Sequence, residues 1–377
     1  MRKNKANIVG GGIGGLAIAA LLARNGYNVN LFEKNETLGG VCNRFSENGF
    51  TFDTGPSWYM MPEIFEDFFS FLGEKVEDHL NLVRLSPACR FFFGSLSQSI
   101  DLSSDFAQDK KAFELLEPGS AERVGRYLEK SRKKYRFVKS HIFNKNRESF
   151  FDYAKLILKK GGLSLGITSS MERDIARVTG NLKLQAVLHY PTLFLGAAPS
   201  HIPAIYNFMT HAAFEHGIWY PIGGMYKIIE TLVSIGKKYG VIYHTSAEVK
   251  SIQIENGMAK GLRLENEKYY PSEIIISNAD RFYTEEYLLP SRYREYQKSH
   301  WGKAKSSYSA LLLFLGANRK IPQLAHHNFF FAENWNKHLH DIENGELSEN
   351  PTFYINMPSV TDAVCAPSNM ENIFVLV

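Results

Sequence analysis

Residues 10–17 read GGGIGGLA and follow directly on the apolar stretch Ala6–Val9. Three of these glycines, Gly10, Gly12 and Gly15, stand at the fixed positions of the pattern G-x-G-x-x-G. In a nucleotide-binding βαβ unit the first glycine permits a tight turn, the second lets the backbone approach a pyrophosphate, and the third lets the helix pack closely on the strand. The stretch therefore suggests a bound dinucleotide, provided that the flanking sequence supplies the other parts of the unit.

The flanking sequence has these parts in the required order. Residues 13–25 are rich in Ala and Leu, which predicts a helix, and Gly26 is suited to close it. The segment Asn28–Phe32 (NVNLF) alternates like a second strand and ends at Glu33. A carboxylate at this place accepts hydrogen bonds from both ribose hydroxyls and repels a 2′-phosphate, so the pattern disfavours NADP.

Composition sets broad limits on the chain. Its 377 residues predict two domains, and 44% hydrophobic with 22% charged residues is typical of a soluble globular protein. A net charge of +4 does not indicate a nucleic-acid partner. Three widely spaced cysteines indicate a reducing cytosol rather than a disulfide framework. We find neither a signal peptide nor a membrane-spanning run, and we expect a cytoplasmic protein.

A second glycine pair favours a flavin over a nicotinamide cofactor. Leu38-Gly39-Gly40 is followed by GFTFDTGPSWY at residues 49–59. A plain NAD enzyme does not need these elements so soon after the first motif. A flavoprotein does, because more backbone from the same domain must reach the isoalloxazine ring.

At this point the chain resembles the bacterial phytoene (carotenoid) desaturase family, whose members are FAD enzymes with an amine-oxidase-like fold. The resemblance is carried by residues 10–35, by LGG, and by GFTFDTGPSWYMMPEIF at residues 49–65. It continues at YPIGGMYK (220–227), SNAD (277–280), HHNFFF (326–331) and NMPSVTD (356–362), and thus covers essentially the whole chain.

The resemblance implies an α/β fold in which a Rossmann-like FAD-binding domain carries an inserted α+β substrate domain. We expect residues 1–75 and 220–285 to form the FAD domain, and residues 76–219 and 286–377 the substrate- and membrane-facing domain. Val249 is expected to contact the adenine through its backbone, although a buried strand valine explains it equally well. The candidate cofactor-binding residues are Gly10, Gly12, Gly14, Gly15, Glu33, Lys34, Gly40, Arg44, Gly55, Pro56, Ser57 and Val249.

Two stretches of the substrate region stand out. Residues 126–160 contain twelve Lys or Arg and three Asp or Glu, and Phe150, Tyr153, Ala154 and Ile157 fall on one helical face. This face suits either ordinary packing on the core or contact with an anionic membrane, and the resemblance favours the membrane. The charge-free run from residue 184 to residue 214 suits either the lining of a long apolar tunnel or ordinary core.

The sequence does not identify a catalytic side chain. Histidines 189, 201, 211 and 216 match no common metal-ligand spacing, so we expect no metal. No Ser-His-Asp or Cys-His arrangement stands out, which suits chemistry carried by a flavin. The general base is left unassigned.

The resemblance implies desaturation of a phytoene-type polyene by hydride transfer to FAD, with oxygen or a membrane quinone as the final acceptor, at the inner face of the cell membrane. Carotenoid isomerases, saturases, ketolases and terminal oxidases share the motifs and remain alternatives, as do an NAD-dependent dehydrogenase and a lipid-binding scaffold without redox activity. Two departures weaken the match. Val41 stands where the family has Arg or Lys, with Arg44 three places later, and the chain ends at Val377 inside an expected strand. We therefore expect a truncated or inactive fragment as a further alternative.

Overall fold

The computed structural model describes residues 4–143, 145, 165–296, 298–303, 309–332, 337–338, 340–341, 344–346 and 348–377. The chain divides into two compact units, and each is described by itself. The first unit comprises residues 1–58, 63–82 and 221–306, and the second comprises residues 59–62, 83–220 and 307–377. Residues 286–306, which the sequence analysis placed in the substrate region, lie in the first unit.

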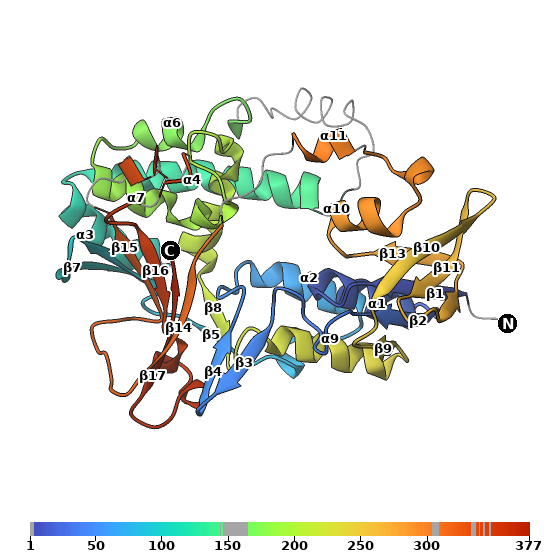
Figure 1. The fold of residues 1–377 in the computed structure, drawn as a ribbon. Coiled ribbons are helices and arrows are strands. Elements are labelled where there is room, and N and C mark those ends of the chain that lie inside the picture. Colours follow the sequence, from blue (N-terminus) through green and yellow to red (C-terminus); the bar gives the residue numbers. More distant parts are fainter. Residues whose placement is uncertain are drawn as a thin grey trace. The chain divides into compact units, whose positions relative to one another are not determined.

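A four-stranded parallel sheet forms the centre of the first unit, in the order β13-β1-β2-β9 (Figure 1). In β1, Ile8 pairs with Leu31 on one side and with Ile276 on the other, so segments distant in sequence become neighbours. Helices α1 and α9 pack against each other. The bounds are β1 (Lys5–Val9), α1 (Ile13–Arg24), β2 (Asn28–Phe32), α9 (Lys227–Lys238), β9 (Ile242–His244) and β13 (Ile274–Ser277).

These elements confirm the predicted βαβ unit almost residue for residue. Helix α1 ends one residue before its predicted end, and Gly26 follows with a φ of +89°, a conformation that few residues other than glycine adopt. An Asn-Gly turn joins β10 to β11 in a hairpin, and Asn256 and Gly257 both have positive φ. The remaining elements of this unit are β3 (Arg44–Glu47), β4 (Phe50–Asp53), α2 (Pro62–Phe71), η1 (Val76–Asp78), β10 (Val249–Glu255), β11 (Met258–Leu264), β12 (Tyr269–Pro271), α10 (Arg281–Tyr283), η7 (Thr284–Leu288), η8 (Ser291–Tyr293) and α11 (Lys298–Trp301).

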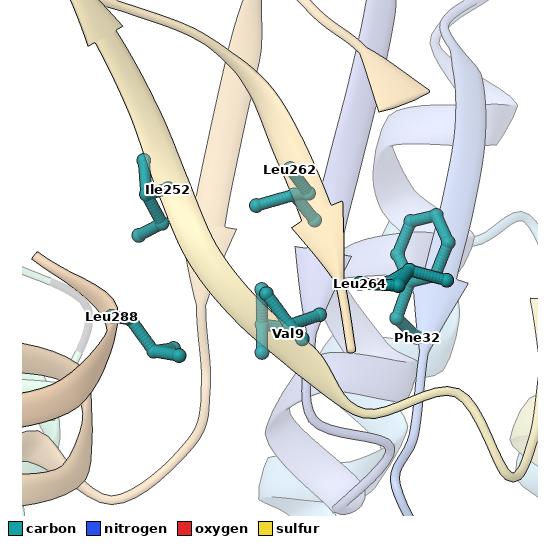
Figure 2. Close-up of a cluster of buried hydrophobic side chains, with 7 residues drawn as sticks. Val9, Phe32, Ile252, Leu262, Leu264 and Leu288 are labelled. Atoms are coloured by element: carbon teal, nitrogen blue, oxygen red, sulfur yellow. The ribbon is translucent and has the colours of Figure 1, made fainter. Parts of the chain in front are cut away.

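The antiparallel sheet β10-β11-β12 covers the carboxyl ends of β1 and β2 through an apolar cluster (Figure 2). Val9 and Phe32 are the last residues of β1 and β2, and both are buried in this cluster. Burial of this apolar surface fixes the strand ends that precede the glycine loop and Glu33. The cluster consists of Val9, Phe32, Val249, Ile252, Leu262, Leu264 and Leu288.

The second unit is built on a six-stranded sheet in the order β14-β17-β16-β15-β6-β7. Phenylalanines stack between the parallel neighbours β6 and β15, where the rings of Phe92 and Phe330 lie 4.3 Å apart. The strands of this sheet are β6 (Cys89–Phe93), β7 (Ser95–Leu102), β14 (Leu312–Ala317), β15 (His327–Phe331), β16 (Phe353–Asn356) and β17 (Glu371–Leu376). A separate two-stranded sheet consists of β5 (Leu82–Arg84) and β8 (Trp219–Pro221). The helical segments include α3 (Phe106–Leu116), α4 (Ser120–Val138), η2 (Lys139–Phe143), α6 (Met171–Ala176), α7 (Leu182–His189), η4 (Tyr190–Leu195), η5 (Ala204–Asn207), α8 (Phe208–His211), η6 (Ala212–His216), η9 (Pro358–Val360) and η10 (Ala363–Cys365).

The charge-free run 184–214 forms short helical pieces inside the second unit. Tyr190 and Phe214 are both almost completely buried, and the Tyr190 ring contacts Phe91 and Phe329 of the sheet. The prolines of the run divide it into separate helical segments. These residues are packed as core, and a role in lining a tunnel stays a prediction.

Two expectations concern the membrane. The amphipathic face at residues 150–157 lies outside the described residues, so the structure gives no account of it. Within the described part of the chain, no helix has the length and apolar character needed to cross a bilayer.

Candidate functional site

Two glycine loops meet at the carboxyl end of β1. The Gly39 N–H donates to the Gly11 carbonyl over 2.8 Å, and Gly12 and Gly39 form a parallel β-bridge. A Cβ on Gly40 would lie 3.2 Å from the Gly12 Cα, which is tighter than nearly all Cβ contacts. The absence of side chains thus lets the two loops approach closely, and they form a surface composed of backbone.

The N-terminus of α1 opens onto this surface. Its N-cap is Gly12, whose backbone is extended, and no described side chain caps the helix. Gly14 in the first turn is exposed. The first N–H groups of a helix have no partner within the helix and carry its positive dipole end, so they form a site for a phosphate group.

The two glycine loops and the N-terminus of α1 together form what we call the cradle. Asn278 lies at one side of it. Its N–H donates to the Val9 carbonyl over 2.8 Å, which fixes the residue directly after β13 and beside the glycine loop. A Cβ on Gly14 would lie 2.7 Å from the Asn278 Oδ1 atom. Asn278 belongs to the stretch SNAD (277–280), for which no role was predicted from the sequence. A sequence feature pointed to Asn278, because it directly follows the apolar run 274–276, and a polar residue after a strand parallel to β1 lies at the same edge of the sheet.

Glu33 lies at the end of β2, on the same edge of the sheet, and is 6% exposed. Its Oε2 accepts a hydrogen bond from the Gly11 N–H over 2.7 Å, and its Oε1 accepts from the Asn35 N–H and amide group at 3.0 and 2.9 Å. A carboxylate offers about four acceptor positions. Three are used within the chain, so about one remains for a hydroxyl of a ligand.

Gly55 lies directly beneath the second glycine loop. A Cβ on Gly55 would come within 1.9 Å of the Val41 carbonyl oxygen, so only glycine fits there without moving backbone. The Val41 side chain is 85% exposed. Burial, followed by the charge of Asp53, raises the pKa of the Cys42 thiol to about 12, so Cys42 is not a thiolate nucleophile near neutral pH.

Asp53 joins the FTFD strand to helix α9. Its carboxylate accepts hydrogen bonds from the Met225 and Tyr226 N–H groups at 2.7 and 3.2 Å, just before α9 begins. It therefore satisfies N–H groups that the helix leaves unpaired. No role for Asp53 was predicted from the sequence, because its partners lie more than 170 residues away.

Arg44 is held within the first unit. Its guanidinium pairs with Glu230 of α9 and lies 4.7 Å from the centre of the Tyr226 ring. Tyr226 in turn donates its hydroxyl hydrogen to the Leu38 carbonyl over 2.9 Å. Arg44 thus ties the start of β3 to α9, and Tyr226 ties the second glycine loop to the start of the same helix. Direct contact of Arg44 with a cofactor stays a prediction.

The other predicted site residues have different surroundings. Lys34 is exposed and its ammonium lies 5.6 Å from the centre of the Tyr283 ring. Pro56 is exposed and Ser57 is half-buried, directly after Gly55. Val249 is buried in the apolar cluster around Val9 and Phe32, close in sequence to Ala247, whose N–H donates to the Glu33 carbonyl. This position is compatible with both interpretations of Val249, a structural valine and a backbone contact.

The cradle suits a dinucleotide. Glycine backbone, an uncapped helix N-terminus and a carboxylate at the end of the next strand are arranged as the pyrophosphate and ribose of such a cofactor require. The first unit is therefore a dinucleotide-binding domain of the Rossmann-like class. In agreement, residues 8–74 match the NAD(P)-binding Rossmann-like domain family.

Comparison with known proteins identifies the family. The chain is 36% identical over 372 residues to a carotenoid 3,4-desaturase of Haloarcula japonica, with 98% of this chain and 75% of the relative covered. It is 34% identical to a zeta-carotene-forming phytoene desaturase of Myxococcus xanthus (98% and 71% covered) and 34% identical to a 4,4′-diapolycopene oxygenase of a Methylomonas species (98% and 74% covered). The chain belongs to the phytoene (carotenoid) desaturase family.

Solved structures agree on the fold. An oxidoreductase from Methanosarcina mazei is similar with a TM-score of 0.63 at 19% identity, covering 99% of this chain and 78% of that structure. Putrescine oxidase is similar with a TM-score of 0.62 at 12% identity, covering 100% of this chain and 76% of that structure. These confirm the expected α/β, amine-oxidase-like architecture.

Proposed function

We propose that this protein is an FAD-dependent oxidoreductase that introduces a double bond into a long-chain, phytoene-type polyene in carotenoid biosynthesis. The observation that carries the proposal is the glycine cradle at the N-terminus of α1, present in a chain that aligns over 98% of its length with carotenoid desaturases. The cradle supplies cofactor binding, and the family relationship supplies the class of substrate.

Different residues of the first unit would bind different parts of FAD. The N–H groups at the start of α1, beside Gly12 and Gly14, would hold the pyrophosphate, and Glu33 would accept a hydrogen bond from the ribose. Lys34, Gly40, Arg44, Pro56, Ser57 and the backbone of Val249 belong to the same proposal. FAD, when bound, supplies the hydride acceptor, and the chain supplies binding and orientation.

The partners follow from the chemistry of the substrate. A long apolar polyene dissolves in lipid, so the enzyme collects it at a membrane surface, and we place the protein peripherally at the inner face of the cell membrane. The basic residues between 126 and 160 favour an anionic bilayer. Oxygen or a membrane quinone would be the final electron acceptor.

Incubation of the purified chain with FAD and phytoene-loaded liposomes tests the proposal. The expected result is a flavin that co-purifies with the protein and a product whose absorption is shifted to longer wavelength, because each new double bond extends the conjugated system. Bound flavin without any change in the phytoene spectrum would exclude desaturation of this substrate. Affinity for NAD without bound flavin would exclude the flavoenzyme.

A second candidate function is oxidation of a carotenoid end group, as in a ketolase or terminal oxidase. It is favoured by the similarity to a 4,4′-diapolycopene oxygenase, at the same 34% identity as the phytoene desaturase. Mass spectrometry of the product separates the two functions, because desaturation removes two hydrogens and oxygenation adds oxygen. Isomerases and saturases are distinguished by the same measurement, since they leave the mass unchanged or raise it by two hydrogens.

A further inference from the structure

A small basic cavity lies in the second unit, lined by residues of α4 and of the α6 segment (residues 171–178). Its volume is about 190 Å³. One water occupies roughly 30 Å³ in the liquid, so the cavity has room for a tetrahedral oxyanion with a few waters and is too small for a polyene. The lining residues are Arg123, Arg126, Tyr127, Lys130, Lys134, Asp174, Arg177 and Val178.

The sequence places the cationic residues on one face of α4. Residues 123, 126, 127, 130 and 134 recur at the three- and four-residue spacing that brings side chains to the same side of a helix. The α6 segment adds Arg177 opposite them. Five cationic side chains and a single carboxylate, Asp174, therefore face one cavity.

Hydrogen bonds hold the side chains of the inner wall of the cavity. The Lys134 side chain is 7% exposed, and its ammonium donates to Asp174 over 2.9 Å and to the Ala204 carbonyl over 2.7 Å. Tyr127 is buried beside it, and the Arg123 Nε donates to the Val178 carbonyl over 2.9 Å. These contacts fix the inner charges in place, so an anion would meet a preorganised site.

Internal acids do not balance the charge. Asp174 pairs with both Lys134 and Arg177, the latter at 3.4 Å. Outside the lining, Glu117 pairs with Arg123 and Glu122 pairs with Arg126. Counting these three acids against the five cations leaves a local excess of two positive charges.

Lys130 is the cation left over. Over the described ranges of the chain, no ion pair involves this exposed ammonium. The positive charge of Lys130 repels that of Lys134. The pKa of Lys134 is lowered, first by burial and also by this repulsion. An anion in the cavity would relieve this repulsion.

We propose that this cavity binds a phosphate group. Arg126 and Arg177 at the rim offer planar forks that match two oxygens of a phosphate, and Lys130 adds a point charge. The group comes either from a lipid headgroup or from a soluble phosphate compound. The site lies wholly in the second unit and does not depend on the proposed flavin chemistry.

The test compares two double variants of the 377-residue chain. Arg126→Gln with Lys130→Gln removes two charges from the cavity, whereas the control, Lys111→Gln with Arg132→Gln, removes two exposed charges of the same unit that do not line it. Inorganic phosphate binding is measured by calorimetry. Vesicle binding is measured by sedimentation with phosphatidylcholine alone and with added phosphatidic acid. Circular dichroism confirms that each variant is folded.

The cavity variant should bind inorganic phosphate about tenfold or more weakly than the wild type, and the control should stay within about twofold. If the cavity variant alone also loses binding to phosphatidic acid vesicles, the phosphate is that of a lipid headgroup. If both variants bind these vesicles equally while only the cavity variant loses inorganic phosphate, the source is a soluble compound. Equal behaviour of the two variants in both assays overturns the proposal, because general charge attraction would then explain all binding.

Discussion

Gly15 and Gly12 occupy the same motif, but the structure predicts opposite consequences for their replacement by alanine. A Cβ on Gly15 would lie 2.0 Å from the Gly10 carbonyl oxygen, about 1.4 Å closer than ordinary van der Waals contact begins. The obstacle is backbone, so α1 must move away from β1. Overpacking of this kind costs up to about 3 kcal/mol, and the better helix propensity of alanine returns about 1 kcal/mol. We expect Gly15→Ala to lower the free energy of unfolding by about 2 kcal/mol.

A Cβ on Gly12, by contrast, meets its nearest described atom at 3.7 Å, and Gly12 has an ordinary negative φ. The free energy of unfolding of Gly12→Ala should therefore lie within about 0.5 kcal/mol of the wild-type value, because the new methyl group overlaps none of the described atoms around it. It should nevertheless weaken FAD binding about tenfold or more, since the methyl group stands where the pyrophosphate approaches the backbone.

Urea unfolding of the flavin-free proteins and titration of FAD by fluorescence measure the two effects separately. Unfolding of Gly15→Ala at the wild-type midpoint would refute the close approach of α1 to β1. FAD binding by Gly12→Ala with wild-type affinity would refute the assignment of this loop to the pyrophosphate.

Three further predictions concern the joints between segments and the buried histidines. Asp53→Ala should lower the free energy of unfolding by about 1–2 kcal/mol because it removes the acceptor for two N–H groups at α9, and urea unfolding beside Asp53→Asn, which keeps one acceptor oxygen, measures this. Gly55→Ala should destabilise the fold, because its Cβ would meet the Val41 carbonyl oxygen at 1.9 Å, and circular dichroism should show a lower melting temperature. A wild-type spectrum and melting temperature would contradict the close approach of Gly55 to the Val41 carbonyl. Burial lowers the pKa of His189 to about 4 and that of His326 to about 3, against an ordinary value of 6.5. Below about pH 6.5 each of these histidines therefore becomes protonated in the unfolded chain but stays neutral in the native chain. As the pH falls from about 6.5 to the native pKa, each histidine lowers the free energy of unfolding by up to about 1.4 kcal/mol per pH unit. Urea midpoints at pH 7.5 and pH 5 check this, and equal midpoints would contradict it.

The βαβ unit was predictable because its signals are local. An Ala- and Leu-rich helix, a closing glycine and an alternating strand each follow from a few neighbouring residues, and the structure confirms α1, Gly26 and β2. The roles of Asp53 and Asn278 were not predicted. Asp53 reaches Met225 and Tyr226, and Asn278 reaches the glycine loop, across more than 170 residues of chain. No local pattern records the partners of Asp53, whereas the position of Asn278 directly after a strand could be read from the sequence.

The sequence by itself determined the type of cofactor cradle and the family, since both depend on the identity and spacing of residues. It did not distinguish glycines that the fold requires from glycines that a ligand requires. Only the tertiary structure decided that a Cβ on Gly15 would meet backbone at 2.0 Å whereas a Cβ on Gly12 would meet its nearest described neighbour at 3.7 Å, because this depends on which segments approach the loop. The same holds for the basic cavity. From the sequence, Arg126 and Lys130 are ordinary charged surface residues. Because α4 packs beside the α6 segment, their charges face one cavity together with Arg177, and this arrangement forms a candidate site for an anion.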